Sequence, residues 1–163
     1  TEQNWKPAHD GDKIILIRHA KAPGGGDPKG FKIEDCKTQR NLDEVGINQS
    51  KKIGKLFKEK KIKIDQVLSS QWCRCKDTAK YAFGNFKEFS ALNSTYTPPY
   101  DQNEKQQIKE LKNYVNNWRG KGGNLVLVTH YVIILAITGE TARSGELVIT
   151  DKNFKVLSTI NTF

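Results

Sequence analysis

The sequence contains no methionine, only three cysteines and three histidines, and no long apolar run. Its longest apolar stretch lies around residues 132–137. This is far shorter than the roughly 20 residues of a membrane-spanning helix, so we expect no membrane span. Three cysteines are also too few for a fold that depends on disulfides. The 163 residues are 36% hydrophobic and 28% charged, and we therefore predict one folded domain over residues 1–163.

The absence of methionine also bears on where the protein works. Because the sequence begins at Thr1 and not at an initiator methionine, we expect that a leading segment, such as a signal peptide, has been removed. This favours a periplasmic or secreted protein, with the cytoplasm as the alternative.

Acidic residues are few relative to basic ones. There are 18 aspartates and glutamates against 27 lysines and arginines, which gives a formal net charge of +9 and a pI near 9.4. Such a charge favours an anionic partner, although a basic surface that is merely solvated is the alternative. The lysines are dispersed and do not alternate with aromatic residues as in base-stacking motifs, so we do not expect nucleic acid as a partner.

The three cysteines are Cys36, Cys73 and Cys75. One Cys-x-Cys pair without a second pair of ligands indicates metal binding only weakly, and we expect no metal site. In an exported protein, one disulfide would join Cys36 to Cys73 or to Cys75 and leave one thiol free. In a cytosolic protein, all three would be small buried residues.

Strand-like apolar runs alternate with segments of helical spacing, which predicts an α/β fold. The predicted strands are 13–17, 66–69, 86–92, 124–129, 146–150 and 154–160; the predicted helices are 43–59, 71–83 with Ser70 as its cap, 102–118 and a short one ending at 137. We predict a three-layer α/β/α sandwich with a mixed, mostly parallel central sheet. Residues 1–12 are polar and contain Pro7 and Gly11, so we predict an extended lead-in there.

Two of the three histidines directly follow apolar strands. Arg18 and His19 come after the first strand, and His130 comes after the strand 124–129. The carboxyl ends of strands are where open α/β sheets bind ligands. A loop with two prolines and four glycines, residues 19–41, follows the first strand, and loops of that length are often functional.

These segments carry a resemblance to a known family. Arg18-His19, the segment 69–74 with Thr78-Ala79, and Val128-Thr129-His130 resemble the signature segments of the histidine phosphatase superfamily, which contains the phosphoglycerate mutases and a branch of small bacterial phosphatases. The segment 40–49 also resembles the signature of the first helix in that family. The resemblance spans residues 14–146, nearly the whole chain.

The resemblance implies roles for individual residues. His19 would be the nucleophile that becomes phosphorylated, and Arg18, Arg74 and His130 would hold the phosphoryl oxygens. Phosphoryl transfer depends mainly on positioning and charge stabilisation, which two guanidiniums supply, so no cofactor or metal is expected. The second ring nitrogen of the nucleophile needs a hydrogen-bond acceptor that fixes its tautomer.

Other site residues are predicted from their place in the chain. Arg40 and Lys21 flank the long loop and are candidate substrate contacts. The general-acid glutamate that many family members carry after the third strand is absent, because Asn93-Ser94 stand there. Glu146 is the first candidate for the proton donor, since it opens a strand expected near the pocket. Asp35, in the long loop, is the second candidate.

The sequence thus predicts a metal-independent phosphatase that hydrolyses a phosphomonoester or a phosphoramidate through a phosphohistidine intermediate. Its substrate would be a phosphorylated small molecule or a phosphoprotein, and phosphate would be a product. The alternative is a non-catalytic module of the same fold that binds phosphoryl groups. A phosphomutase is less favoured, because a mutase must retain its phosphoryl group and exclude water.

Overall fold

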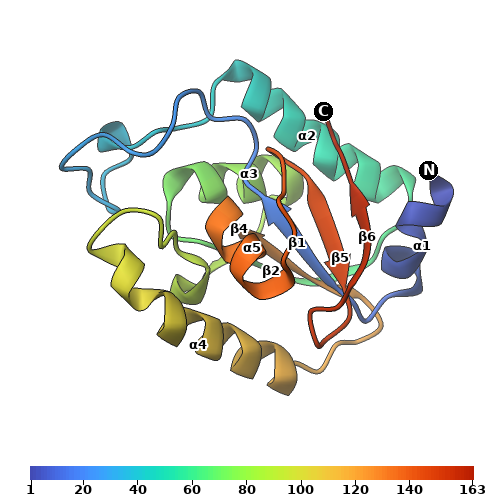
Figure 1. The fold of residues 1–163 in the computed structure, drawn as a ribbon. Helices are drawn as coiled ribbons and strands as arrows, with labels where there is room; N and C mark the ends of the chain where they lie inside the picture. The colour runs from blue at the N-terminus through green and yellow to red at the C-terminus, as the bar shows by residue number, and fades with distance from the viewer.

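A six-stranded mixed sheet runs through the centre of the molecule in the computed structural model, which describes residues 1–163 (Figure 1). The strands lie in the order β3-β2-β4-β1-β5-β6. They are β1 (Ile14–Arg18), β2 (Ile64–Ser69), β3 (Lys87–Glu88), β4 (Asn124–Thr129), β5 (Leu147–Thr150) and β6 (Val156–Ile160). β1, β2, β3 and β4 are parallel, β5 is antiparallel to β1, and β6 is antiparallel to β5. The predicted mixed, mostly parallel sheet is confirmed.

Helices cover both faces of the sheet, and two apolar clusters fill the space between. The helices are α1 (Glu2–Asp10), α2 (Glu44–Glu59), α3 (Cys73–Phe83), α4 (Glu104–Asn117) and α5 (Tyr131–Thr138), with short 3-10 turns η1 (Cys36–Thr38), η2 (Ser90–Leu92) and η3 (Tyr100–Asn103). Successive strand residues point to opposite faces. Accordingly, Ile15 and Ile17 pack with α1, α2 and α3, while Ile14 and Leu16 pack with α4 and α5. The three-layer sandwich is confirmed, and none of its helices is long and apolar enough to cross a membrane.

The prediction of an extended lead-in over residues 1–12 is wrong, because α1 occupies most of this segment. The Thr1 hydroxyl accepts a hydrogen bond from the Asn4 backbone and caps the helix. Trp5 and Ala8 lie about one turn apart and are buried, with Trp5 packed edge-on against the Phe57 ring at 5.7 Å. Burial of this face outweighs the local signal of Pro7, which the helix contains.

The third strand is also shorter than predicted. Of the predicted strand 86–92 only the two residues of β3 pair in the sheet, and after Phe89 the chain enters η2. Gln107 on α4 explains the turn, because its amide donates hydrogen bonds to the carbonyls of Ala91 and Asn93. The start of α3 differs as well: Trp72, not Ser70, is its N-cap residue.

A disulfide links the long loop to the start of α3. Cys36, in η1, is bonded to Cys73, with Cα atoms 5.7 Å apart, while Cys75 is a buried free thiol. Beside this bond, the Gln39 side chain accepts a hydrogen bond from the Cys73 backbone. The loop is therefore fixed to the helix that carries Arg74.

Candidate active site

A cavity of about 230 Å³ opens at the carboxyl ends of β1 and β4. The loop 19–41 and the segment after η2 form its other walls. Its lining residues are Arg18, His19, Gly24, Gly25, Gly26, Asp27, Arg40, Arg74, Ser94, Tyr96, Thr97, His130, Tyr131 and Val132. The sheet thus brings together four of the residues that the sequence predicts for the site, and Arg40 joins them.

His19 is held in one orientation directly after β1. Its Nδ1 lies 2.9 Å from the Ala20 carbonyl oxygen, so this nitrogen carries the proton and the unprotonated Nε2 accepts a hydrogen bond from Arg74 Nε. The Ala20 backbone is itself fixed, because its N–H donates to the Thr78 hydroxyl. Burial, followed by repulsion from Arg74, lowers the pKa of His19 well below its usual range. The ring is therefore neutral at pH 7.

Arg74 reaches His19 from the first turn of α3. Its Nε lies 3.3 Å from His19 Nε2, and one terminal nitrogen lies 2.8 Å from Asp27 Oδ1. The side chains of Arg74 and Asp27 are each only 4% exposed. This buried pair fixes the guanidinium beside the atom that would attack phosphorus.

Two further guanidiniums have donors without acceptors. The Nε atoms of Arg18 and Arg40 are buried and have no hydrogen-bond partner. Other nitrogens of these side chains do have partners: Arg18 donates to the Ala142 carbonyl and Arg40 to the Ala22 carbonyl. Unpartnered buried donors are costly, and both side chains line the cavity. They are ready to receive the oxygens of an anion.

His130 faces His19 across the cavity, with ring centroids 5.7 Å apart. Its Nε2 lies 2.8 Å from the Ser70 hydroxyl, which is also close to Asn93 Oδ1 at 3.3 Å. Burial and then the neighbouring Arg74 lower the pKa of His130 well below its usual range. In the unliganded protein, His130 is thus a neutral hydrogen-bonding group, and only a bound anion would favour its protonated form.

The remaining predicted residues lie outside the cavity lining. The Lys21 ammonium pairs with Asp43, the N-cap residue of α2, at 2.9 Å. The Glu146 carboxylate accepts a hydrogen bond from the Arg143 backbone. Asp35 is exposed and caps η1. The structure therefore gives all three side chains local structural contacts and does not bring them to His19.

Asp27 is the cavity residue that sequence reasoning missed. Its Oδ2 accepts a hydrogen bond from the Trp72 indole at 2.9 Å, and its Oδ1 accepts one from the Arg40 backbone at 3.0 Å. Burial raises the pKa of Asp27, but the hydrogen bonds and charge of Arg74 outweigh it and hold the pKa below its usual range. The one available signal was an acidic residue directly after three glycines in the long loop.

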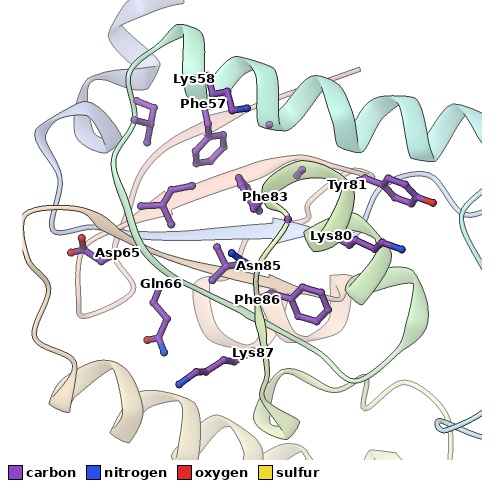
Figure 2. Close-up of a pocket in the computed structure, with 16 residues that line it drawn as sticks. Phe57, Lys58, Asp65, Gln66, Lys80, Tyr81, Phe83, Asn85, Phe86 and Lys87 are labelled. Carbon is purple, nitrogen blue, oxygen red and sulfur yellow. The ribbon is translucent and has the colours of Figure 1, made fainter.

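A larger groove, of about 840 Å³, lies elsewhere, between the ends of α2 and α3 and the edge of β2 (Figure 2). Its walls include Phe57, Phe83 and Phe86, and no histidine or arginine lines it. Its one carboxylate, Asp65, already accepts hydrogen bonds from the backbone of Lys121 and Gly123. The larger groove therefore lacks the histidines and arginines that make the smaller cavity at the strand ends the candidate site.

Comparison with known families agrees with this geometry. The sequence model of the histidine phosphatase superfamily (branch 1) matches residues 14–121. That stretch carries Arg18, His19, Arg40 and Arg74. The chain belongs to the histidine phosphatase superfamily. None of the curated proteins compared with the chain matches it.

Solved structures share the fold at low sequence identity. A phosphoglycerate mutase from Thermus thermophilus has a TM-score of 0.65 and 16% identity, over 91% of this chain and 98% of that one. A structure described as the phosphohistidine phosphatase SixA from Agrobacterium tumefaciens has a TM-score of 0.62 and 18% identity, over 92% and 97%. One described as an α-ribazole-5′-phosphate phosphatase from Escherichia coli has a TM-score of 0.64 and 13% identity, over 93% and 97%.

Proposed function

We propose that the protein is a phosphatase that transfers a phosphoryl group from its substrate to His19 Nε2 and then to water. The observation that carries this proposal is the unprotonated Nε2 of His19, which accepts only a 3.3 Å hydrogen bond from Arg74 Nε, in a cavity that Arg18 and Arg40 also line. Three guanidiniums face this cavity against one carboxylate. That surplus of positive charge matches the −1.5 to −2 charge of a phosphoryl group at neutral pH.

In this proposal, each residue of the site has its own role in the reaction. The neutral ring of His19 attacks phosphorus, and a covalent intermediate splits one difficult hydrolysis into two easier steps. Arg18, Arg40 and Arg74 stabilise the charge on the equatorial oxygens in a cavity that is preorganised for it. His130 donates to the same oxygens once the anion has raised its proton affinity.

The cavity volume bears on what the substrate presents. About 230 Å³ is below the usual 300–1,000 Å³ of pockets that hold a whole ligand of drug size. The phosphoryl group and the first atoms of its leaving group would fill it, with the rest of a phosphorylated small molecule or phosphoprotein outside. The Cys36–Cys73 disulfide supports our proposal that the protein works in an oxidising compartment, such as the periplasm or the extracellular space.

Trapping the intermediate tests the function. We expect denaturant-quenched reactions with ³²P-labelled substrate to show phosphate on His19, stable to alkali and labile to acid. We expect His19→Ala to remove this label and to lower the hydrolysis of p-nitrophenyl phosphate by about 10³-fold or more, because the nucleophile is lost. The matched control is His9→Ala, since His9 is exposed on α1, and it should keep full activity.

The same experiment separates the alternatives. Wild type that binds phosphate but neither labels nor hydrolyses any ester would be a phosphoryl-binding module. Labelled protein that releases phosphate only to an added alcohol, and not to water, would be a mutase. Either result contradicts the phosphatase proposal.

A further inference from the structure

A leaving alcohol needs a proton, and neither predicted donor is in a position to give one. Glu146 and Asp35 lie outside the cavity lining, whereas Asp27 is the one carboxylate within it. We propose that Asp27 is the proton donor of the reaction and that the site therefore takes phosphomonoesters of unactivated alcohols. This inference rests on the proposed phosphatase function and assigns its substrate class.

The geometry places Asp27 where an acid has to be. In-line transfer puts the leaving oxygen opposite the attacking nitrogen. The Arg74 guanidinium contacts His19 Nε2 through its Nε and Asp27 Oδ1 through a terminal nitrogen, so it spans the gap between these two groups. Because both groups contact the same guanidinium, a phosphoryl group that enters the cavity beside Arg74 meets the nucleophile and the Asp27 carboxyl together, and our proposal puts its leaving oxygen on the Asp27 side.

The carboxyl group is also held still. Its two oxygens accept hydrogen bonds from Arg74, the Trp72 indole and the Arg40 backbone. A carboxylate has about four acceptor sites, so these contacts leave room for a leaving oxygen. Cys73 lies between Trp72 and Arg74 in the chain, and its disulfide to Cys36 links these two partners of Asp27 to the long loop. Such fixed placement is what proton transfer in the transition state requires.

The proton is brought by the substrate. In the free protein, Asp27 is ionised and pairs with Arg74. Arg40, Arg18 and the neutral side chains of His19 and His130 line the same cavity. Phosphomonoesters have a second pKa near 6, so part of the substrate is a monoanion at neutral pH. When this monoanion binds, its proton passes to Asp27. The phosphoryl group is then a dianion that the arginines bind, and its negative charge favours the protonated form of the neighbouring Asp27 carboxyl over the carboxylate.

The bonds and protons then balance over two steps. The Nε2–P bond forms while the P–O bond to the leaving group breaks, and Asp27 gives its proton to the leaving oxygen, which departs as an alcohol. In the second step, Asp27 takes a proton from water as the water oxygen attacks phosphorus and the Nε2–P bond breaks. That proton leaves with the product, which departs as the phosphate monoanion. The products are an alcohol and inorganic phosphate, and His19 and Asp27 return to their starting states.

Leaving-group dependence tests the assignment. Asp27→Asn keeps an acceptor oxygen for Arg74 and the Arg40 backbone, replaces the oxygen that faces the Trp72 indole by an amide NH2, and removes the acidic proton. We expect kcat/KM for glycerol phosphate and ethyl phosphate to fall by about 10²- to 10⁴-fold, the usual contribution of a general acid. For acetyl phosphate and 2,4-dinitrophenyl phosphate, whose leaving groups need no proton, it should fall by less than about tenfold. kcat/KM is the correct readout because it reports the steps up to formation of the phosphoenzyme.

Two matched variants complete the test. Asp35→Asn is the same replacement in the same loop, and Glu146→Gln tests the acid that the sequence favours; both should keep wild-type rates on all four substrates. An equal loss on activated and unactivated esters in Asp27→Asn would make Asp27 a positioning residue for Arg74 and overturn the proposal. Unchanged rates in Asp27→Asn would also overturn the proposal, as would a wild type that hydrolyses acetyl phosphate but not alkyl esters. A wild type inert on every ester would instead overturn the phosphatase function itself.

Discussion

Two buried histidines make the folding stability of this protein depend on pH in the acidic range. Burial lowers the pKa of His19 and of His130 well below the value of about 6.5 that they have in the unfolded chain. Below pH 6.5 the unfolded chain therefore binds protons that the folded protein does not, and folding stability falls as pH falls. Each histidine contributes a slope of about 1.4 kcal/mol per pH unit in that range.

Urea unfolding between pH 5 and 7.5 in phosphate-free buffer measures this slope. We expect stability to change little from pH 7.5 to 7 and to decrease on each step below 6.5. The double variant His19→Gln/His130→Gln should lose most of the slope, while His9→Gln should keep it. An unchanged slope in the double variant would show that other groups titrate in this window.

The residues around the cavity show which positions of a site can be predicted from a sequence and which cannot. His19 and His130 were predicted together because each directly follows a parallel strand, and the ends of such strands meet at one edge. Asp27 was missed because it lies in a loop whose path depends on contacts far along the chain, with Arg74 and Trp72. Lys21 and Glu146 are near His19 in chain or sheet position, but their side chains bind Asp43 and the Arg143 backbone and do not line the cavity.

At the scale of elements, the Cys36–Cys73 disulfide stabilises the fold and the loop over the cavity. It closes a chain segment with a sequence separation of 37 residues, for which chain-entropy arguments give about 3–4 kcal/mol. We expect Cys36→Ser to lower the free energy of unfolding by that order. We also expect it to lower kcat/KM, because the freed loop carries Asp27 and Arg40.

Reductant provides the control. Dithiothreitol should give wild type the stability and the kcat/KM of Cys36→Ser, and it should have no further effect on the variant. The Cys75 thiol should not interfere, because burial raises its pKa to about 12 and keeps it protonated. Equal stability of oxidised and reduced wild type would contradict a structural role for this bond.

Elements were predicted best where burial and periodicity agree. The strands 124–129 and 13–17 and the helix 43–59 were close to β4, β1 and α2, because long apolar patterns define them. α1 and β3 were not predicted correctly, since tertiary contacts decide them: Trp5 packs on Phe57, and Gln107 turns the chain after β3. Local polarity and β-propensity carry no information about such partners.

At the scale of the whole molecule, the net charge of +9 should draw anionic substrates toward the cavity. Charges more than about 10 Å apart in water are screened at 0.1 M salt. Long-range attraction therefore acts on association and fades with ionic strength, whereas the buried arginines that hold the bound phosphoryl group are screened much less. We expect kcat/KM for a dianionic ester to fall several-fold as NaCl rises from 20 to 500 mM, with little change in kcat.

Charge reversal away from the cavity tests this expectation. Lys58, Lys80 and Lys87 are exposed around the larger groove (Figure 2), and none of them lines the cavity at the strand ends. Replacing all three by glutamate lowers the net charge by two per residue, from +9 to +3. The triple variant should have a lower kcat/KM than wild type at 20 mM NaCl and an equal one at 500 mM, because steering has then been screened in both.

A triple arginine variant keeps the charge and should follow wild type throughout. A deficit in the glutamate variant that persists at 500 mM NaCl would show that these lysines act through structure and not through the field of the molecule.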